Sequence, residues 1–184
     1  MEALVTPRLI LEPMTLPLVE AVFRGDRAAL EQISGAKIPA AWPGRVLVER
    51  AFSASLDAIR GAPATRLWGD RLMITRNVPG GDAERLVIGS IIFHGRPGPS
   101  GIAEVGYGVE ESWQGKGVAS EGTLAAVEWA LAQEGVRVVT ATTPPWHVAS
   151  IRVLEKSGLV RVCTEEHDTF GEVLRFERHR EPRQ

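Results

Sequence analysis

Two glycines separated by one residue, Gly115 and Gly117, join two segments of different pattern. Residues 104–109 before them are strand-like, and residues 118–132 after them carry apolar side chains at helical spacing. A short turn from a strand into a helix aims unpaired backbone N–H groups into one space at the positive end of the helix dipole. Glycine allows unusual φ values there and leaves no Cβ between the backbone and an approaching anion. This pattern predicts a site for a phosphate group.

The spacing of the glycines excludes two common phosphate loops. A Walker loop needs two glycines followed by Lys-Ser or Lys-Thr, and no segment has that spacing. A dinucleotide-binding fingerprint needs a third glycine where Ser120 stands. The turn does fit Gln-x-x-Gly-x-Ala, formed by Gln114, Gly117 and Ala119. This resembles the pyrophosphate-binding motif of the GNAT family of N-acetyltransferases, which bind acetyl-coenzyme A (acetyl-CoA).

Two further segments carry the same resemblance, to the family's branch of ribosomal-protein N-terminal acetyltransferases. That branch has Asn-x-x-Ser and then a helix that ends in Glu-Lys-x-Gly-Phe. The matching residues here are Ser150, Glu155, Lys156 and Gly158. Leu159 replaces the aromatic residue, and His147 replaces the Asn. Near the start of the chain, residues 6–11 resemble the first strand of the branch.

The composition suits one globular domain. The chain has 184 residues, of which 44% are hydrophobic and 24% charged, and a net charge of −2 that makes no case for a nucleic-acid partner. No apolar run approaches the roughly 18 residues of a membrane span, and no signal peptide is recognisable, so we expect a cytoplasmic protein without a membrane partner. The single cysteine, Cys163, has the apolar neighbours Val160 and Val162 and is expected to be a buried structural thiol. The histidines have no metal-ligand spacing, so no metal site is expected.

Periodicity and turn signals predict the elements. Strands are expected over residues 8–12, 67–75, 86–93, 102–109, 136–142, 159–164 and 173–178. Helices are expected over residues 16–33, capped by Thr15, and over 46–59, 118–134 and 149–157. Trp42, in a loop between the first two helices, is expected to be a structural plug or to shape a substrate pocket.

The order of these elements predicts an α/β fold with a mixed sheet and helices on its faces. The resemblance implies a single GNAT-like domain over residues 1–179. Its central, mostly antiparallel twisted sheet would splay at the cofactor site, with helices on both faces. Residues 180–184 are expected to form a loose tail.

The resemblance implies acetyl-CoA as co-substrate, bound by the turn and by the start of the later helix. The expected cofactor-binding residues are Val109, Gln114, Gly115, Lys116, Gly117, Val118, Ala119, Ser120, His147 and Arg152. For Lys116 and Arg152, a solvated surface cation is the alternative. For His147 we expect a structural hydrogen bond in place of the family's Asn, and a titrating group beside the reaction centre is the alternative.

Acetyl transfer to an amine needs a proton acceptor, because an ammonium group with a pKa of about 8 to 10 is not nucleophilic. Glu104, a carboxylate inside an apolar strand, is our first choice for this proton acceptor, and the alternative is a strand glutamate that simply faces solvent. Glu165, Glu166 and Asp168 are further candidates. The resembled family often places a hydroxyl near the thiol at the position of Ser150, so Ser150 is expected to protonate the departing thiolate, or else to be a simple helix N-terminal residue. The resemblance also implies that backbone N–H groups near Val109 polarise the thioester carbonyl. The glycines at 106 and 108 would leave room for the pantetheine arm, or for a bulky neighbour such as Trp129.

The resemblance, together with these residues, predicts an acetyl-CoA-dependent N-acetyltransferase that works by direct transfer as a monomer or homodimer. Its acceptor would be a primary amine, either a protein N-terminus or a small molecule. Two alternatives remain: an acyltransferase that uses another acyl-CoA, and a non-catalytic acyl-CoA-binding or sensor module.

Overall fold

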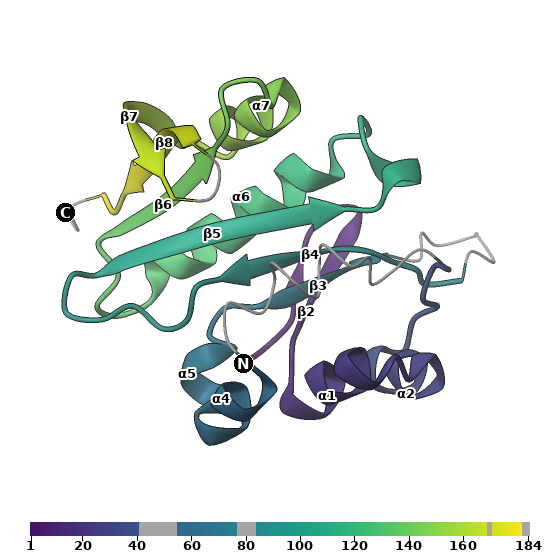
Figure 1. Ribbon diagram of the computed structural model, residues 1–184. Coiled ribbons are helices and arrows are strands. Elements are labelled where there is room, and N and C mark those ends of the chain that lie inside the picture. Colours follow the sequence, from purple (N-terminus) through teal and green to yellow (C-terminus); the bar gives the residue numbers. More distant parts are fainter. Residues whose placement is uncertain (41–54, 77–83, 169–170, 182–184) are drawn as a thin grey trace.

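The strands of the protein form one mixed sheet (Figure 1). The computed structural model describes residues 1–40, 55–76, 84–168 and 171–181. The described strands are β1 (Leu4–Val5), β2 (Leu9–Pro13), β3 (Arg71–Thr75), β4 (Val87–Phe93), β5 (Ile102–Val109), β6 (Val138–Thr143), β7 (Val160–His167) and β8 (Gly171–His179). Their order across the sheet is β1-β2-β3-β4-β5-β6-β8-β7. The pair β5 and β6 is parallel, and the other described neighbours are antiparallel.

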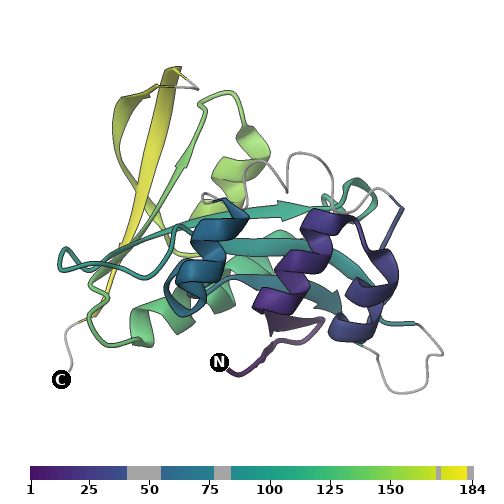
Figure 2. The same ribbon diagram turned by 60° about the horizontal axis from the view of Figure 1, so that its bottom comes forward.

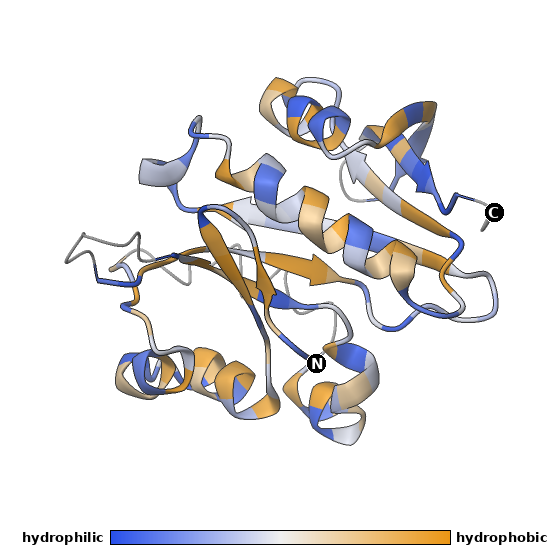
Figure 3. Cartoon of the chain, turned by 180° about the vertical axis from the view of Figure 1, so that it is seen from behind, coloured by the Kyte–Doolittle hydropathy of each residue, from blue (hydrophilic) through white to orange (hydrophobic). Residues whose placement is uncertain are grey.

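Helices cover both faces of the sheet. The described helices are α1 (Leu16–Arg24), α2 (Arg27–Ser34), α4 (Leu56–Gly61), α5 (Pro63–Arg66), α6 (Val118–Ala132) and α7 (Val148–Lys156). Figure 2 shows α1, α2 and α4 in front of one face, and Figure 3 shows α6 crossing the other face. The mixed α/β fold with helices on both faces, expected from the order of elements, is confirmed.

Each face of the sheet has its own apolar core. Successive side chains of a strand point to opposite faces, so Met73 of β3 joins the core under α6, while Leu72 and Ile74 join the core under α1 and α2. Val127 of α6 and Val19 of α1 are fully buried in these two cores. Burial on both faces explains why the central strands are almost continuously apolar.

The sheet opens between β5 and β6. The two strands pair only from Ile102 to Glu104 on β5 and from Val138 to Thr140 on β6. Beyond that point β5 continues with β4 and β6 continues with β8, among the described strands. Figure 1 shows β6 turning away from β5 toward α7. The expected splay is therefore confirmed.

The single helix predicted over residues 16–33 is wrong, because it is two helices. α1 ends at Gly25, which has a φ of 65° and donates its N–H to the carbonyls of the preceding turn. Asp26 then caps α2 by accepting the N–H of Ala29 at 3.0 Å. A left-handed glycine followed by an aspartate ends one helix and starts the next. Thr15 does stand at the start of α1, but its side chain makes no capping hydrogen bond.

Other boundaries also differ from the prediction. The strand expected from residue 67 starts at Arg71, because α5 and a turn through Gly69 (φ 82°) precede it. The buried thiol is wrong: Cys163 is exposed, as are its neighbours Val160 and Val162, because β7 is an edge strand. Trp42 and residues 46–54 of the helix expected over residues 46–59 lie outside the described residues. The remainder of that predicted helix falls in the described part of the chain, where α4 begins at Leu56.

Candidate active site

The turn between β5 and α6 contains two residues in the left-handed region. A 3₁₀ turn, Glu111–Trp113, follows β5, and residues 114–117 lead directly into α6. Gly115 and Gly117 have φ values of 72° and 77°, which a side chain with a Cβ would resist. Gln114 closes the turn, because its Nε2 donates to the carbonyl oxygen of Val109 at 3.1 Å.

The first turn of α6 directs N–H groups to this turn of the chain. Val118, Ala119 and Ser120 begin the helix, where backbone N–H groups have no intrahelical partner. Together with the helix dipole, they make this end of α6 suitable for an anion. Lys116 adds a cation, with its Nζ 5.0 Å from the centroid of the Trp113 ring.

Helix α7 packs beside the same end of α6. The Ser157 hydroxyl, at the C-terminal end of α7, donates to the Val153 carbonyl oxygen at 2.8 Å and lies 3.5 Å from the carbonyl oxygen of Ser120 on α6. Arg152 belongs to α7, the helix next to the turn, and its side chain is exposed. The two helices are thus held together where a phosphate would bind.

Backbone N–H groups of β5 point into the opening between β5 and β6. Glu110 donates its N–H to the carbonyl of Ile88 on β4 at 2.8 Å. Because bonding directions alternate along an extended strand, the N–H of Val109 points to the opposite edge. That edge faces β6, with which β5 no longer pairs at this level. An acyl oxygen in the opening would find a main-chain donor there.

The glycines of β5 leave open space beside the strand. A Cβ at Gly106 or Gly108 would meet no atom within 4 Å. Trp129 packs elsewhere, with its ring centroid 5.0 Å from that of Trp68, so the alternative that these glycines accommodate Trp129 is wrong. The close approach involves Gly89 of β4 instead, where a Cβ would lie 2.3 Å from the carbonyl oxygen of Gly108.

Ser150 is hydrogen-bonded across the opening. The hydroxyl of Tyr107, on β5, lies 2.9 Å from the Ser150 hydroxyl oxygen and donates toward the Ser150 carbonyl oxygen at 3.0 Å. Burial raises the pKa of Tyr107 to about 12, although the hydrogen bond with Ser150 opposes the shift. Tyr107 therefore stays protonated and remains a hydrogen-bond donor at neutral pH.

Tyr107 did not emerge from the sequence as a site residue. Its signal is visible afterwards: it is the one tyrosine of the chain, and it lies between two glycines on the strand that leads into the turn. A phenol in that position has a polar end that needs a partner once the ring is buried.

Glu104 lies on the other face of β5 from Tyr107. Ala103 and Val105 pack in the core under α6, so Glu104 between them points to the opposite face. It is half-buried and pairs with Thr140, the last residue of β6 that pairs with β5. The structure thus places the two candidate catalytic residues on opposite sides of the opening, one on each face of the sheet.

His147 caps α7. Its Nδ1 accepts the backbone N–H of Ser150 at 3.2 Å, as the side chain of an Asn at this position would do. The ring also stacks on Trp146, with centroids 5.6 Å apart and planes 13° from parallel. Both side chains are exposed, and Trp146 is 76% accessible. His147 thereby helps to hold Ser150 at the first turn of the helix.

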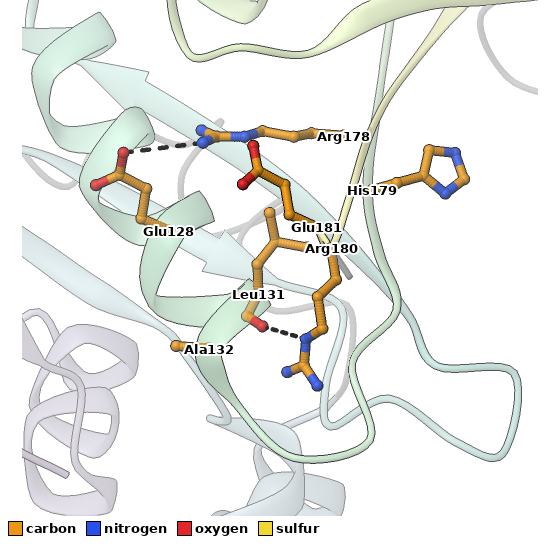
Figure 4. A pocket seen from close by; sticks show the side chains of 7 residues that line it. All are labelled: Glu128, Leu131, Ala132, Arg178, His179, Arg180 and Glu181. Atoms are coloured by element: carbon orange, nitrogen blue, oxygen red, sulfur yellow. Dashed lines mark hydrogen bonds and ion pairs between the residues drawn. The ribbon is translucent and has the colours of Figure 1, made fainter. Parts of the chain in front are cut away.

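A separate hollow of about 270 Å³ lies at the other end of α6 and is no part of this site. Figure 4 shows Arg180 beside it, with its Nε donating to the Leu131 carbonyl oxygen at 2.6 Å. The Arg180 backbone N–H also bonds to the Arg137 carbonyl oxygen at 2.8 Å. Arg180 is therefore packed, which corrects the tail boundary expected there. Residues 182–184 lie outside the described part of the chain.

Two negative findings apply to the described residues. No three His, Cys, Asp or Glu side chains within them gather into a possible metal site. No helix among them is long and apolar enough to span a bilayer.

Comparison with known proteins identifies the family. Residues 8–160 match the family model described as Acetyltransferase (GNAT) domain. Over 160 residues, the chain is 26% identical to a protein of Bacillus subtilis (strain 168) named "Uncharacterized N-acetyltransferase YjdG", and the match covers 87% of this chain and 90% of that protein.

Solved structures share the fold. The chain is similar to RimL, a ribosomal L7/L12 alpha-N-protein acetyltransferase solved with coenzyme A (TM-score 0.61, 17% identity, 97% of this chain and 98% of that chain). It is also similar to the ribosomal-protein-S5-alanine acetyltransferase from Vibrio fischeri (TM-score 0.62, 12% identity, 98% of this chain and 97% of that chain). The region that matches the family model includes β5, the turn, α6 and α7, and the protein is thus an N-acetyltransferase of the GNAT family.

Proposed function

We propose that this protein transfers the acetyl group of acetyl-CoA directly to a primary amine. The observation that carries the proposal is the opening between β5 and β6, which has Val109 on one edge and Ser150 bonded across it. Acetyl-CoA would be anchored by its pyrophosphate at the turn, and its pantetheine arm would enter this opening and present the thioester to the Val109 N–H.

The cofactor would be bound along the turn and the two helices beside it. The glycines at 115 and 117 and the N–H groups of residues 118–120 would receive the pyrophosphate. Lys116 and Arg152 would supply cations for the phosphates. Gln114 and His147 would act indirectly, because their side chains bond to the backbone at Val109 and Ser150.

The two faces of the opening would serve the two halves of the reaction. The amine nitrogen would bond to the acetyl carbon from the side of Glu104, and its proton would pass to that carboxylate directly or through water. The carbon–sulfur bond would break toward Ser150, which would donate its proton to the thiolate while it accepts a hydrogen bond from Tyr107. Water would then return a proton to Ser150 and take up the proton from Glu104. The products would be an amide and coenzyme A (CoA).

The acceptor would be a protein N-terminus or a small-molecule amine. Two structural neighbours are named for ribosomal-protein acetylation, which makes N-terminal peptides the first class to test. We place the protein in the cytoplasm, as a monomer or homodimer.

The proposal is tested by incubating the protein with acetyl-CoA and a panel of amines, with products identified by mass spectrometry. The panel should hold peptides with free N-termini, the same peptides with blocked N-termini, and small mono- and polyamines. The expected result is an acetylated amine that forms only when the protein is present. Faster transfer from propionyl- or succinyl-CoA would favour another acyl donor. CoA binding without transfer to any amine would favour the sensor module and contradict the proposal.

A further inference from the structure

The N-terminal segment is bonded to the first turn of α6. Thr6 donates its hydroxyl to Glu121 Oε1 at 2.6 Å, and the backbone N–H of Arg8 donates to the same oxygen at 2.8 Å. Arg8 Nε donates to the other oxygen, Oε2, at 2.6 Å. Both oxygens of one carboxylate are therefore occupied by residues that lie 113 and 115 positions away in the sequence.

The negative charge of Glu121 would oppose the binding of an anion at the start of α6. It lies in the first turn of α6, the helix whose N-terminal N–H groups face the turn. A carboxylate there interacts well with the helix dipole, but it repels a second anion that binds to the same end. Burial alone would raise the pKa of Glu121, but the hydrogen bonds from Thr6 and Arg8 outweigh it and hold that pKa below its usual range. Glu121 is therefore charged at neutral pH, and Arg8 is its counter-ion.

Arg8 also bonds to the turn itself. Its Nη1 donates to the carbonyl oxygen of Lys116 at 2.7 Å. In a trans peptide the carbonyl and the following N–H point in opposite directions, so the N–H of Gly117 points away from Arg8. The guanidinium group of Arg8 also lies next to Gly117: a Cβ placed on Gly117 would be 3.5 Å from Arg8 Nη2. Arg8 thus sets the direction in which this peptide presents its donor.

We propose that Arg8 is a positioning residue for the CoA pyrophosphate, which neutralises Glu121 and orients the Lys116–Gly117 peptide toward the anion. Arg8 acts from beneath the turn and does not itself contact the phosphates. The inference rests on the proposed function, since it requires that CoA binds at this turn.

The test is calorimetric titration of CoA into four proteins: the parent, Arg8→Ala, Glu121→Gln and the double variant Arg8→Ala/Glu121→Gln. Arg8→Ala leaves the Glu121 carboxylate without its counter-ion, so CoA affinity is expected to fall by about tenfold. Removing that charge in the double variant is expected to restore affinity by at least about threefold relative to Arg8→Ala. A purely structural role would not give this recovery, because the double variant lacks even more hydrogen bonds.

Arg76→Ala is the matched control. Arg76 donates to the Thr6 carbonyl oxygen at 3.1 Å, so its loss removes an arginine contact to the same segment without touching Glu121 or the turn. Its CoA affinity should stay within twofold of the parent, and thermal unfolding should show that each variant is folded.

The outcomes separate the two proposals. Parent-like CoA affinity in folded Arg8→Ala, or no recovery of affinity in the double variant, overturns the proposed role of Arg8 but leaves the proposed function standing. A folded parent that binds no CoA contradicts the proposed function, and the role of Arg8 with it.

Discussion

The hydroxyl oxygens of Tyr107 and Ser150 lie 2.9 Å apart, across the line where β5 and β6 stop pairing. The phenol has one proton and two acceptors in reach, the Ser150 hydroxyl and the Ser150 carbonyl oxygen. If it donates to the hydroxyl, the serine proton is free to be donated to a sulfur atom in the opening. If it donates to the carbonyl, the serine proton points back to the phenol. The direction in which Ser150 donates is therefore coupled to the acceptor that Tyr107 uses.

Removing the Ser150 hydroxyl should slow acetyl transfer without weakening CoA binding. Ser150→Ala is expected to lower kcat on the order of 10²-fold, the lower range for loss of a general acid. Ser100→Ala is a suitable control, because it also removes a serine hydroxyl, and Ser100 is exposed just before the far end of β5. A kcat near that of the parent in Ser150→Ala, with a verified acceptor, would leave Ser150 as a helix residue only.

The phenol of Tyr107 should resist ionisation. Its pKa is raised to about 12, whereas an unfolded tyrosine ionises near pH 10. Between these values the unfolded chain loses the proton and the folded chain keeps it, so stability falls as pH rises through this window. The chain contains one tyrosine, so phenolate absorbance reports this group directly. A titration midpoint near 10 in the folded protein would contradict the buried, bonded phenol.

Replacing His147 by Asn should preserve activity, because Asn can also accept the Ser150 N–H as a helix cap. His147→Ala loses that cap, and we expect it to cost about 0.5 to 2 kcal/mol of stability and to loosen the helix start that carries Ser150. The measurement is the pH–rate profile of both variants beside the parent. If His147→Asn abolished an ionisation near pH 6 to 7 and lost most of its rate above it, His147 would be the general base instead.

Asp70 should lower the stability of the protein at neutral pH. Burial raises the pKa of Asp70 well above its usual range, although the N–H of Phe93 donates to its Oδ1 at 2.7 Å. The unfolded chain releases this proton near pH 4, so stability falls as pH rises from there until the folded carboxyl ionises. Asp70→Asn keeps the acceptor and cannot ionise. Its unfolding midpoint should exceed that of the parent at pH 7, by a margin that shrinks toward pH 4; a constant margin would be inconsistent with this assignment.

Local signals in the sequence predicted the centre of the fold well. β5 was predicted with its observed bounds, and α6 was predicted to start at Val118 as observed, because a glycine turn separates two clear periodicities. The same local signals misplaced Cys163. Apolar neighbours suggest burial, but whether a strand is central or at an edge depends on pairing with distant segments.

The contacts of the site show the same limit. Gln114, Gly117 and Ser150 belong to short motifs, which can be recognised without knowing the fold. Tyr107 and Ser150 are 43 positions apart, and their hydrogen bond exists only because β6 diverges from β5 and carries α7 beside it. The family resemblance predicted the divergence, but no local pattern tells which side chains meet across it, so the phenol became visible as a site residue only in the structure.

Binding of CoA to the turn between β5 and α6 is the central claim, and calorimetry of the parent and Gly117→Val tests it most directly. Valine resists the φ of 77° at this position, so the N–H groups should no longer converge on the pyrophosphate. Gly135→Val is the matched control, because Gly135 has a φ of 81° with open space around it and lies at the other end of α6. We predict that Gly117→Val lowers CoA affinity by at least about tenfold while Gly135→Val does not. Equal affinity in the parent and a folded Gly117→Val would contradict the assignment.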